Sequence, residues 1–163
     1  MTDELRATAT AVLTAARARG WKIATAESCT GGLVAGALTD IAGSSDVFDR
    51  GFVTYSNTAK QQMLSVPADI LREHGAVSRE TAEAMARGAL GKAKVDIVVA
   101  ITGIAGPGGG GPGKPVGLVH FAASTRAGKL THHEARYGDI GRAEVRQKSV
   151  LQALAMLRQM AEA

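Results

Sequence analysis

The apolar run Val95–Thr102 constrains the fold of this 163-residue chain more than any other segment. Its letters, VDIVVAIT, lack the polar–apolar alternation of a strand with one face in water. The run therefore predicts a strand buried on both faces, in the middle of a sheet. Further strands are expected at Trp21–Ala26 and Phe48–Tyr55, and an antiparallel hairpin at 116–124 and 130–137. The predicted sheet is therefore mixed.

Helices are expected in most of the segments between these strands. Apolar residues recur every three or four positions in 3–19 and in a final helix, which is expected from a cap at Asp139 to about residue 161. Other helices are expected at 31–42, after a cap at Asn57, from Pro67, and from a cap at Ser78 to about Lys92. Because helices would cover both faces of the sheet, the sequence predicts a three-layer α/β/α fold, with residues 1–163 as a single domain.

The composition excludes several classes of protein. Hydrophobic residues make up 45% of the chain, yet no apolar run approaches the roughly 20 residues of a membrane span. The net charge of +4 comes from scattered basic residues, and aromatic residues, at 4%, are too few for base stacking, so nucleic acid is not the expected partner. The single cysteine, Cys29, has no partner for a disulfide, which favours a reducing compartment and predicts a cytoplasmic protein.

Polar side chains follow three of the predicted strands. In open α/β sheets, ligands bind beyond the carboxyl ends of the parallel strands. The first junction supplies Glu27, Ser28, Cys29 and Thr30; the second supplies Tyr55, Ser56, Asn57 and Lys60; the third supplies Thr102 and a glycine-rich loop. If the three strands run parallel, these groups meet in one site.

Ser28 and Lys60 are the candidate catalytic pair. A serine is a weak nucleophile unless a base takes its proton, and none of the four histidines falls at the converging junctions. A lysine can be that base if burial or a nearby cation lowers its pKa. Tyr55 is placed to hold or relay the proton, and the N–H groups of Thr30 and Gly31 are placed to face an oxyanion.

A purely structural interpretation of the same residues stays open. Ser28 would then be a helix cap, Lys60 a surface residue and Tyr55 an aromatic residue at the sheet edge. Cys29 is the rival nucleophile, but without a histidine partner it is better explained as a small buried residue.

The glycine-rich loop 103–115 contains a near match to a phosphate-binding loop at Gly108–Lys114. Pro115 stands where that motif needs a hydroxyl for magnesium, and a strand follows instead of a helix, so we expect a mobile loop or lid. Gly103 and Gly106 would let the backbone approach a ligand, and Arg142 is either a phosphate ligand or a surface charge. Metal-ligand spacing is absent apart from His132-His133, which point to opposite faces of a strand, so no metal or other cofactor is expected.

Five strings together resemble the CinA C-terminal domain family: ATAESCTGG (24–32), GFVTYSNTAK (51–60), HGAVS (74–78), TGIAGPGGG (102–110) and KPVGLV (114–119). The resemblance covers roughly residues 5–160, although the tail of the glycine loop is richer in glycine than is typical of the family. It implies a five-stranded, mainly parallel mixed sheet in an α/β/α sandwich. Stand-alone members include nicotinamide mononucleotide amidohydrolases, so it also implies hydrolysis of the carboxamide of nicotinamide mononucleotide, giving nicotinic acid mononucleotide and ammonia in pyridine nucleotide salvage.

The resemblance also implies roles for individual residues. Ser28 resembles the nucleophile, Lys60 its base, and Tyr55 the tyrosine that precedes that lysine. Thr102 and Arg142 match a hydroxyl residue at the end of the central strand and a basic residue assigned to the substrate. A non-catalytic module that senses nucleotides through the same junctions is the alternative. We also expect a homo-oligomer, because an exposed hairpin edge favours pairing.

Overall fold

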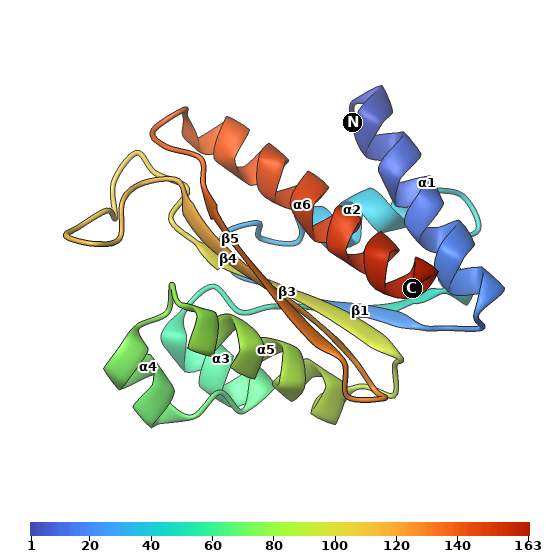
Figure 1. The fold of residues 1–163 in the computed structure, drawn as a ribbon, viewed down its shortest axis with the longest axis horizontal. Helices are drawn as coiled ribbons and strands as arrows, with labels where there is room; N and C mark the ends of the chain where they lie inside the picture. The colour runs from blue at the N-terminus through green and yellow to red at the C-terminus, as the bar shows by residue number, and fades with distance from the viewer.

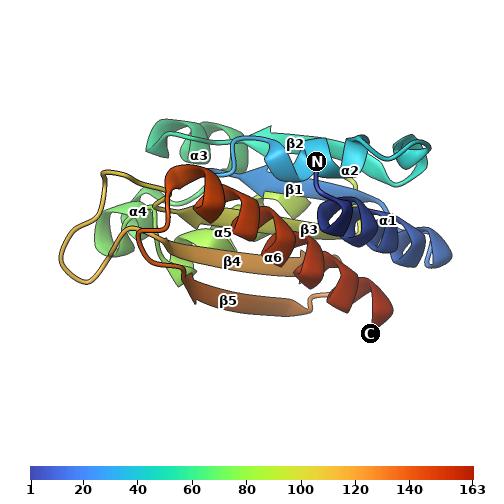
Figure 2. The ribbon, with the colours of Figure 1, turned by 90° about the horizontal axis from the view of Figure 1, so that it is seen from above.

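A five-stranded sheet lies between two layers of helices in the computed structural model, which covers residues 1–163 (Figure 1). The strands are β1 (Ile23–Glu27), β2 (Phe48–Val53), β3 (Ile97–Gly103), β4 (Leu118–Thr125) and β5 (Leu130–Arg136). Their order is β2-β1-β3-β4-β5, which Figure 2 shows from above. β1 is parallel to β2 and β3, whereas β4 is antiparallel to both of its neighbours, so only β4 runs against the other strands. The predicted three-layer fold with a mixed, mainly parallel sheet is confirmed.

The central strand is β3, as its apolar run predicts. Residues 97–102 are all buried, and the side chains of residues 97–101 alternate between two hydrophobic clusters of 26 and 15 residues. Ile97, Val99 and Ile101 face the larger cluster, while Val98 and Ala100 face the smaller one. Both faces of β3 are apolar because a helical layer excludes water from each of them.

Three helices cover each face of the sheet. The first layer contains α1 (Asp3–Ala18), α2 (Leu33–Thr39) and α6 (Arg142–Glu162); the second contains α3 (Asn57–Leu64), α4 (Ala68–His74) and α5 (Arg79–Lys92) (Figure 1). Between α2 and β2 the chain forms one short 3₁₀ turn at Ser44–Asp46.

The helix caps agree with the sequence in one case and differ in two. Ser78 caps α5 as predicted, since its hydroxyl accepts the N–H of Thr81 at 3.1 Å. The cap of α3 is Ser56, not the expected Asn57, which is already helical. The prediction that Asp139 caps α6 is wrong: Gly141 precedes the helix and no side chain accepts from its first turn.

Gly88 allows α5 to pack closely against the end of α3. A Cβ at this position would lie 1.9 Å from the carbonyl oxygen of Leu64, which is too close for any side chain. Gly88→Ala is therefore expected to lower the free energy of unfolding by about 3 kcal/mol. Gly91→Ala in the same helix, where nothing lies within 4 Å, is expected to raise it by up to about 1 kcal/mol. Urea unfolding of the two variants measures the difference, and similar effects at both positions would contradict it.

Candidate active site

The carboxyl ends of β1, β2 and β3 lie at the same edge of the sheet, as predicted, because these strands are mutually parallel. A cavity of about 240 Å³ opens there. The three candidate catalytic residues and four of the six candidate substrate-binding residues line it: Ser28, Tyr55, Lys60, Thr102, Gly103, Gly106 and Arg142. The convergence of the three junctions is therefore confirmed.

Lys60 directs its amine at the hydroxyl of Ser28. The distance from Nζ to Ser28 Oγ is 2.9 Å, and the lysine is only 1% exposed. The same nitrogen donates to the carbonyl oxygens of Thr54, at 2.7 Å, and Tyr55, at 3.4 Å. Lys60 is therefore neither a surface residue nor part of an ion pair.

Burial lowers the pKa of the Lys60 ammonium from its ordinary value of 10.5 to about 8. A fraction of this amine is consequently neutral near pH 7. A neutral amine has two N–H donors and one lone pair. Because the carbonyls of Thr54 and Tyr55 can take both donors, the lone pair is left for the hydroxyl proton of Ser28, which is the arrangement that a general base needs.

Glu27 is a buried carboxylate that fixes the start of α2. Its two oxygens accept from the N–H groups of Val34, at 2.9 Å, and Ala35, at 3.0 Å, and from the hydroxyl of Thr30 at 2.7 Å. A negative charge at a helix N-terminus is stabilised by the unpaired N–H groups and by the helix dipole. Sequence reasoning assigned no role to this residue, although a carboxylate just before a glycine-started helix is a signal for such a cap.

One of the two N–H groups expected to face an oxyanion forms a hydrogen bond within the turn that follows Ser28. The N–H of Gly31 donates to the carbonyl of Ser28 at 3.0 Å, which contradicts the expectation that it faces an oxyanion. The positive φ of 55° at Gly31 bends the chain into this bond. Thr30 is fully buried with its hydroxyl on Glu27, and neither Thr30 nor Gly31 lines the cavity. Cys29 does line it, and its N–H donates to no backbone carbonyl.

The thiol of Cys29 is not suited to nucleophilic attack. The residue is 5% exposed, and burial raises its pKa to about 11, so the thiol stays protonated at neutral pH. Because the thiolate is the reactive form, the interpretation of Cys29 as a small buried residue is confirmed.

Tyr55 and Arg142 close one side of the cavity together. Nη2 of Arg142 donates to the Tyr55 hydroxyl at 2.9 Å, and Nη1 donates to the carbonyl of Gly106 at 2.8 Å. The Tyr55 hydroxyl therefore contacts Arg142 and not the Ser28–Lys60 pair, which Tyr55 reaches through its backbone carbonyl. Arg142 and Lys60 are the charged residues of the cavity, and no acidic residue lines it, so its electrostatic potential favours an anion.

Thr102 and the glycines of the third junction shape the cavity wall. The Thr102 hydroxyl donates to the carbonyl of Ala76 at 2.7 Å and so holds the segment before α5. A Cβ on Gly103 would lie 2.7 Å from the side chain of Val119, and one on Gly106 would lie 2.6 Å from that of Val116. These glycines are thus required for packing of the loop. The strand β4 follows the loop, in agreement with the rejection of a phosphate-binding loop.

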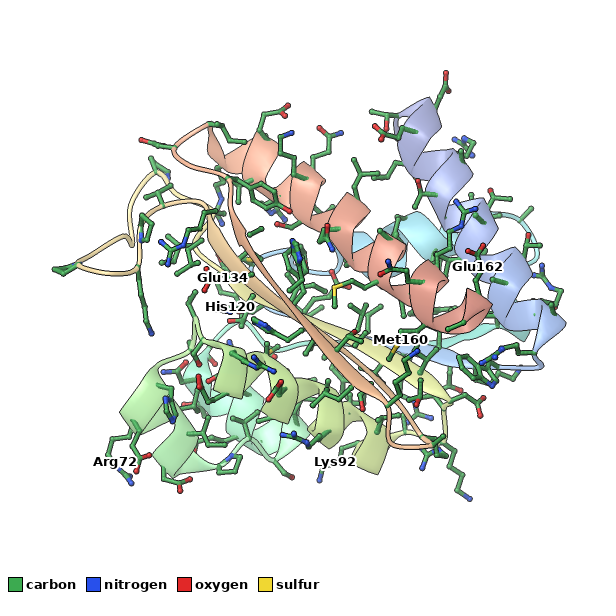
Figure 3. All side chains as sticks on the ribbon, viewed as in Figure 1. Arg72, Lys92, His120, Glu134, Met160 and Glu162 are labelled. Atoms are coloured by element: carbon green, nitrogen blue, oxygen red, sulfur yellow. The ribbon has the colours of Figure 1, made fainter.

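The histidines lie away from this cavity. His132 stacks on His120 with ring centroids 5.2 Å apart, whereas His133 contacts Phe121, so the adjacent pair faces opposite sides of β5 as predicted. Figure 3 shows His120 beside Glu134, and the distance from His120 Nε2 to Glu134 Oε1 is 3.7 Å. No group of three or more His, Cys, Asp or Glu side chains is arranged to hold a metal ion. None of the helices is both long and apolar enough to cross a bilayer.

Comparison with known proteins identifies a family. The model of the CinA C-terminal domain matches residues 5–161. Nicotinamide-nucleotide amidohydrolase PncC of Escherichia coli is 52% identical over 159 residues, which are 96% of this chain and 95% of that protein. A CinA-like protein of Syntrophobacter fumaroxidans is 52% identical over 141 residues, 86% of this chain but 33% of that protein. The chain spans between 26% and 36% of the length of several such curated relatives.

A solved structure extends the similarity to three dimensions. The crystal structure of competence/damage inducible protein CihA from Agrobacterium tumefaciens matches this fold with a TM-score of 0.96 at 54% sequence identity. The match covers 98% of this chain and 97% of that one.

Proposed function

This chain belongs to the CinA C-terminal domain family, and on that premise we propose that it is an amidohydrolase that converts nicotinamide mononucleotide to nicotinic acid mononucleotide and ammonia. The relative from Escherichia coli, which has nearly the same length, carries the name of this activity. The observation on which the proposal depends is the contact of 2.9 Å between Ser28 Oγ and the buried Lys60 Nζ inside the cavity. Recovery of pyridine nucleotides in the cytoplasm is the proposed setting.

The proposed reaction has two halves that use the same base. Lys60 takes the hydroxyl proton while Ser28 Oγ bonds to the carboxamide carbon, which places a negative charge on the amide oxygen. When the C–N bond breaks, Lys60 returns the proton to the leaving nitrogen and ammonia departs. Water then attacks the acyl-enzyme with Lys60 as base again, which releases the carboxylate product and restores Ser28.

Two features of the cavity support a mononucleotide as substrate. The N–H of Cys29, which donates to no backbone carbonyl, is available to the amide oxygen as it becomes charged. Arg142 supplies the planar donor group that suits a phosphate, and no carboxylate in the lining repels that anion. Removal of the phosphate from the substrate is therefore expected to weaken binding.

Ammonia release is the direct test of the proposed function. Wild-type protein is incubated separately with nicotinamide mononucleotide and with nicotinamide riboside, which lacks the phosphate. Ammonia is measured in both reactions by a coupled assay. We expect turnover of the mononucleotide and a higher KM for the riboside. Tight binding of the mononucleotide with no ammonia would favour the nucleotide-sensing alternative.

The self-association expected from the sequence stays a prediction. Analytical sedimentation of the same sample measures the oligomeric state.

The pH dependence of this reaction follows from the state of Lys60. Only the neutral amine can accept a proton, and its pKa is about 8. Activity should therefore appear as the pH rises: kcat/KM should increase about tenfold per unit well below pH 8 and level off above about pH 9. Initial rates of ammonia release between pH 6 and about pH 10 measure the profile. A rate that falls over this range would show that the charged amine is the active form.

A further inference from the structure

Arg126 and Arg146 each donate to two or more backbone carbonyls without forming an ion pair, and Arg146 contacts the turn after Ser28. Arg146 in α6 donates from Nε to the carbonyl of Cys29 at 3.1 Å and from Nη2 to that of Thr30 at 3.4 Å. Arg126, after β4, donates to the carbonyls of Val95, Leu90 and Ala93 at 2.7 to 2.9 Å. The two side chains share a mode of contact, but only Arg146 contacts the segment that carries the candidate nucleophile.

The contacts of Arg146 determine the orientation of two consecutive peptide groups. A trans peptide is planar, and its N–H points away from its C=O, so a bond to the carbonyl of one residue also orients the N–H of the next. Arg146 thereby orients the peptide groups that follow Cys29 and Thr30. The peptide before Cys29 is held from its other side, because the N–H of Gly31 donates to the carbonyl of Ser28.

Gly31 leaves room for this guanidinium. A Cβ at Gly31 would lie 3.3 Å from Nη2 of Arg146, which is tighter than ordinary contact, and the φ of 55° already disfavours a side chain there. The glycine that the sequence suggested for substrate binding therefore has a second explanation. The absence of a side chain at Gly31 lets Arg146 of α6 reach the turn formed by Ser28–Gly31.

We propose that Arg146 is a positioning residue that holds the Ser28–Gly31 turn in the geometry needed for attack by Ser28. This inference rests on the proposed amidohydrolase function. Without the guanidinium, the turn can relax, and both Ser28 Oγ and the N–H of Cys29 shift relative to the substrate. A displacement near 1 Å at a reacting group can lower a rate by about a hundredfold.

The test compares Arg146→Gln with Arg126→Gln as the matched control. In Arg146→Gln, kcat should fall by about 10- to 100-fold, while KM changes by less than about threefold. The midpoint of the pH profile should stay near the wild-type value, because the contacts of Lys60 with Thr54 and Tyr55 are untouched. Arg126→Gln should lower the thermal midpoint and leave kcat unchanged. Arg146→Lys should recover only part of the rate that Arg146→Gln loses. The lysine ammonium can still donate to a carbonyl of the turn, but it lacks the planar guanidinium that contacts two carbonyls at once.

A readout without substrate separates this proposal from the proposed function. Cys29 is the only cysteine and is 5% exposed, so its reaction with a thiol reagent under native conditions reports opening of the turn. Labelling should be at least about tenfold faster in Arg146→Gln than in wild type or Arg126→Gln. If wild type releases no ammonia, faster labelling would still support the positioning role. Unchanged labelling in Arg146→Gln, or equal losses of kcat in the two glutamine variants, would overturn it.

Discussion

Replacement of Ser28 by alanine is expected to lower kcat for ammonia release about a thousandfold or more, with little loss of stability. Ser28 Oγ is the only hydroxyl within hydrogen-bond distance of Lys60, so no neighbouring group can take its place. The thiol of Cys29 cannot substitute, because it is buried with a pKa of about 11. The measurement is ammonia release at saturating substrate, combined with thermal unfolding to confirm that the variant is folded.

Cys29→Ala is the matched control for this prediction. It alters the adjacent residue in the same turn, and its backbone N–H, the proposed oxyanion donor, is retained. We expect its kcat to stay within about threefold of wild type, because a buried thiol-to-methyl change affects packing more than chemistry. If Ser28→Ala kept more than a tenth of the wild-type rate, or if Cys29→Ala were the inactive variant, the acyl-serine mechanism would have to be abandoned.

Replacement of Lys60 by methionine is expected to lower kcat as much as Ser28→Ala does and, at the same time, to stabilise the protein at pH 7. Below pH 8 the wild type keeps a charged ammonium almost fully buried without a carboxylate partner, which disfavours the folded state. Methionine has a similar length and no charge. The lost bonds to the carbonyls of Thr54 and Tyr55 offset part of the gain, so we expect a net increase of about 1–2 kcal/mol in the free energy of unfolding.

The pH dependence of stability identifies Lys60 as the cause of this gain. The pKa of Lys60 is about 8 in the folded protein and near its ordinary value of 10.5 when unfolded. Between these values the unfolded chain binds more protons, so wild-type stability should rise with pH by up to about 1.4 kcal/mol per unit. Lys60→Met should lack this contribution. Urea unfolding at intervals across this range compares the two proteins, and parallel pH dependences would refute the assignment.

Local sequence patterns were sufficient to predict most of the architecture. The run Val95–Thr102 identified the central strand, and helical periodicity together with cap and proline signals identified the six helices with boundary errors of a few residues. The largest error was α2, predicted over 31–42 but observed over Leu33–Thr39. It begins late because Gly31 and Gly32 both adopt positive φ. Periodicity reports which face of a segment is buried, but it does not report the backbone conformation of a glycine.

The convergence of the candidate catalytic groups was also predictable, whereas their individual contacts were not. Once three strands were expected to be parallel, topology alone brought Ser28 and Lys60 to one edge of the sheet. The hydroxyl of Tyr55, however, binds Arg142, which lies 87 positions later in the chain. Such partners depend on where α6 packs, and no pattern within either segment contains that information.

The order of apolar and polar residues by itself determined the layers, the central strand and the edge where chemistry can occur, because burial of apolar surface is decided by short repeats along the chain. Only the tertiary structure decided which donor meets which acceptor. Glu27 accepts from the first turn of α2, and the N–H of Gly31 donates to the carbonyl of Ser28. Arg146 donates to the carbonyl of Cys29, which lies 117 positions earlier in the chain. Hydrogen bonds act over about 3 Å and at defined angles, so they are set by the final placement of the elements.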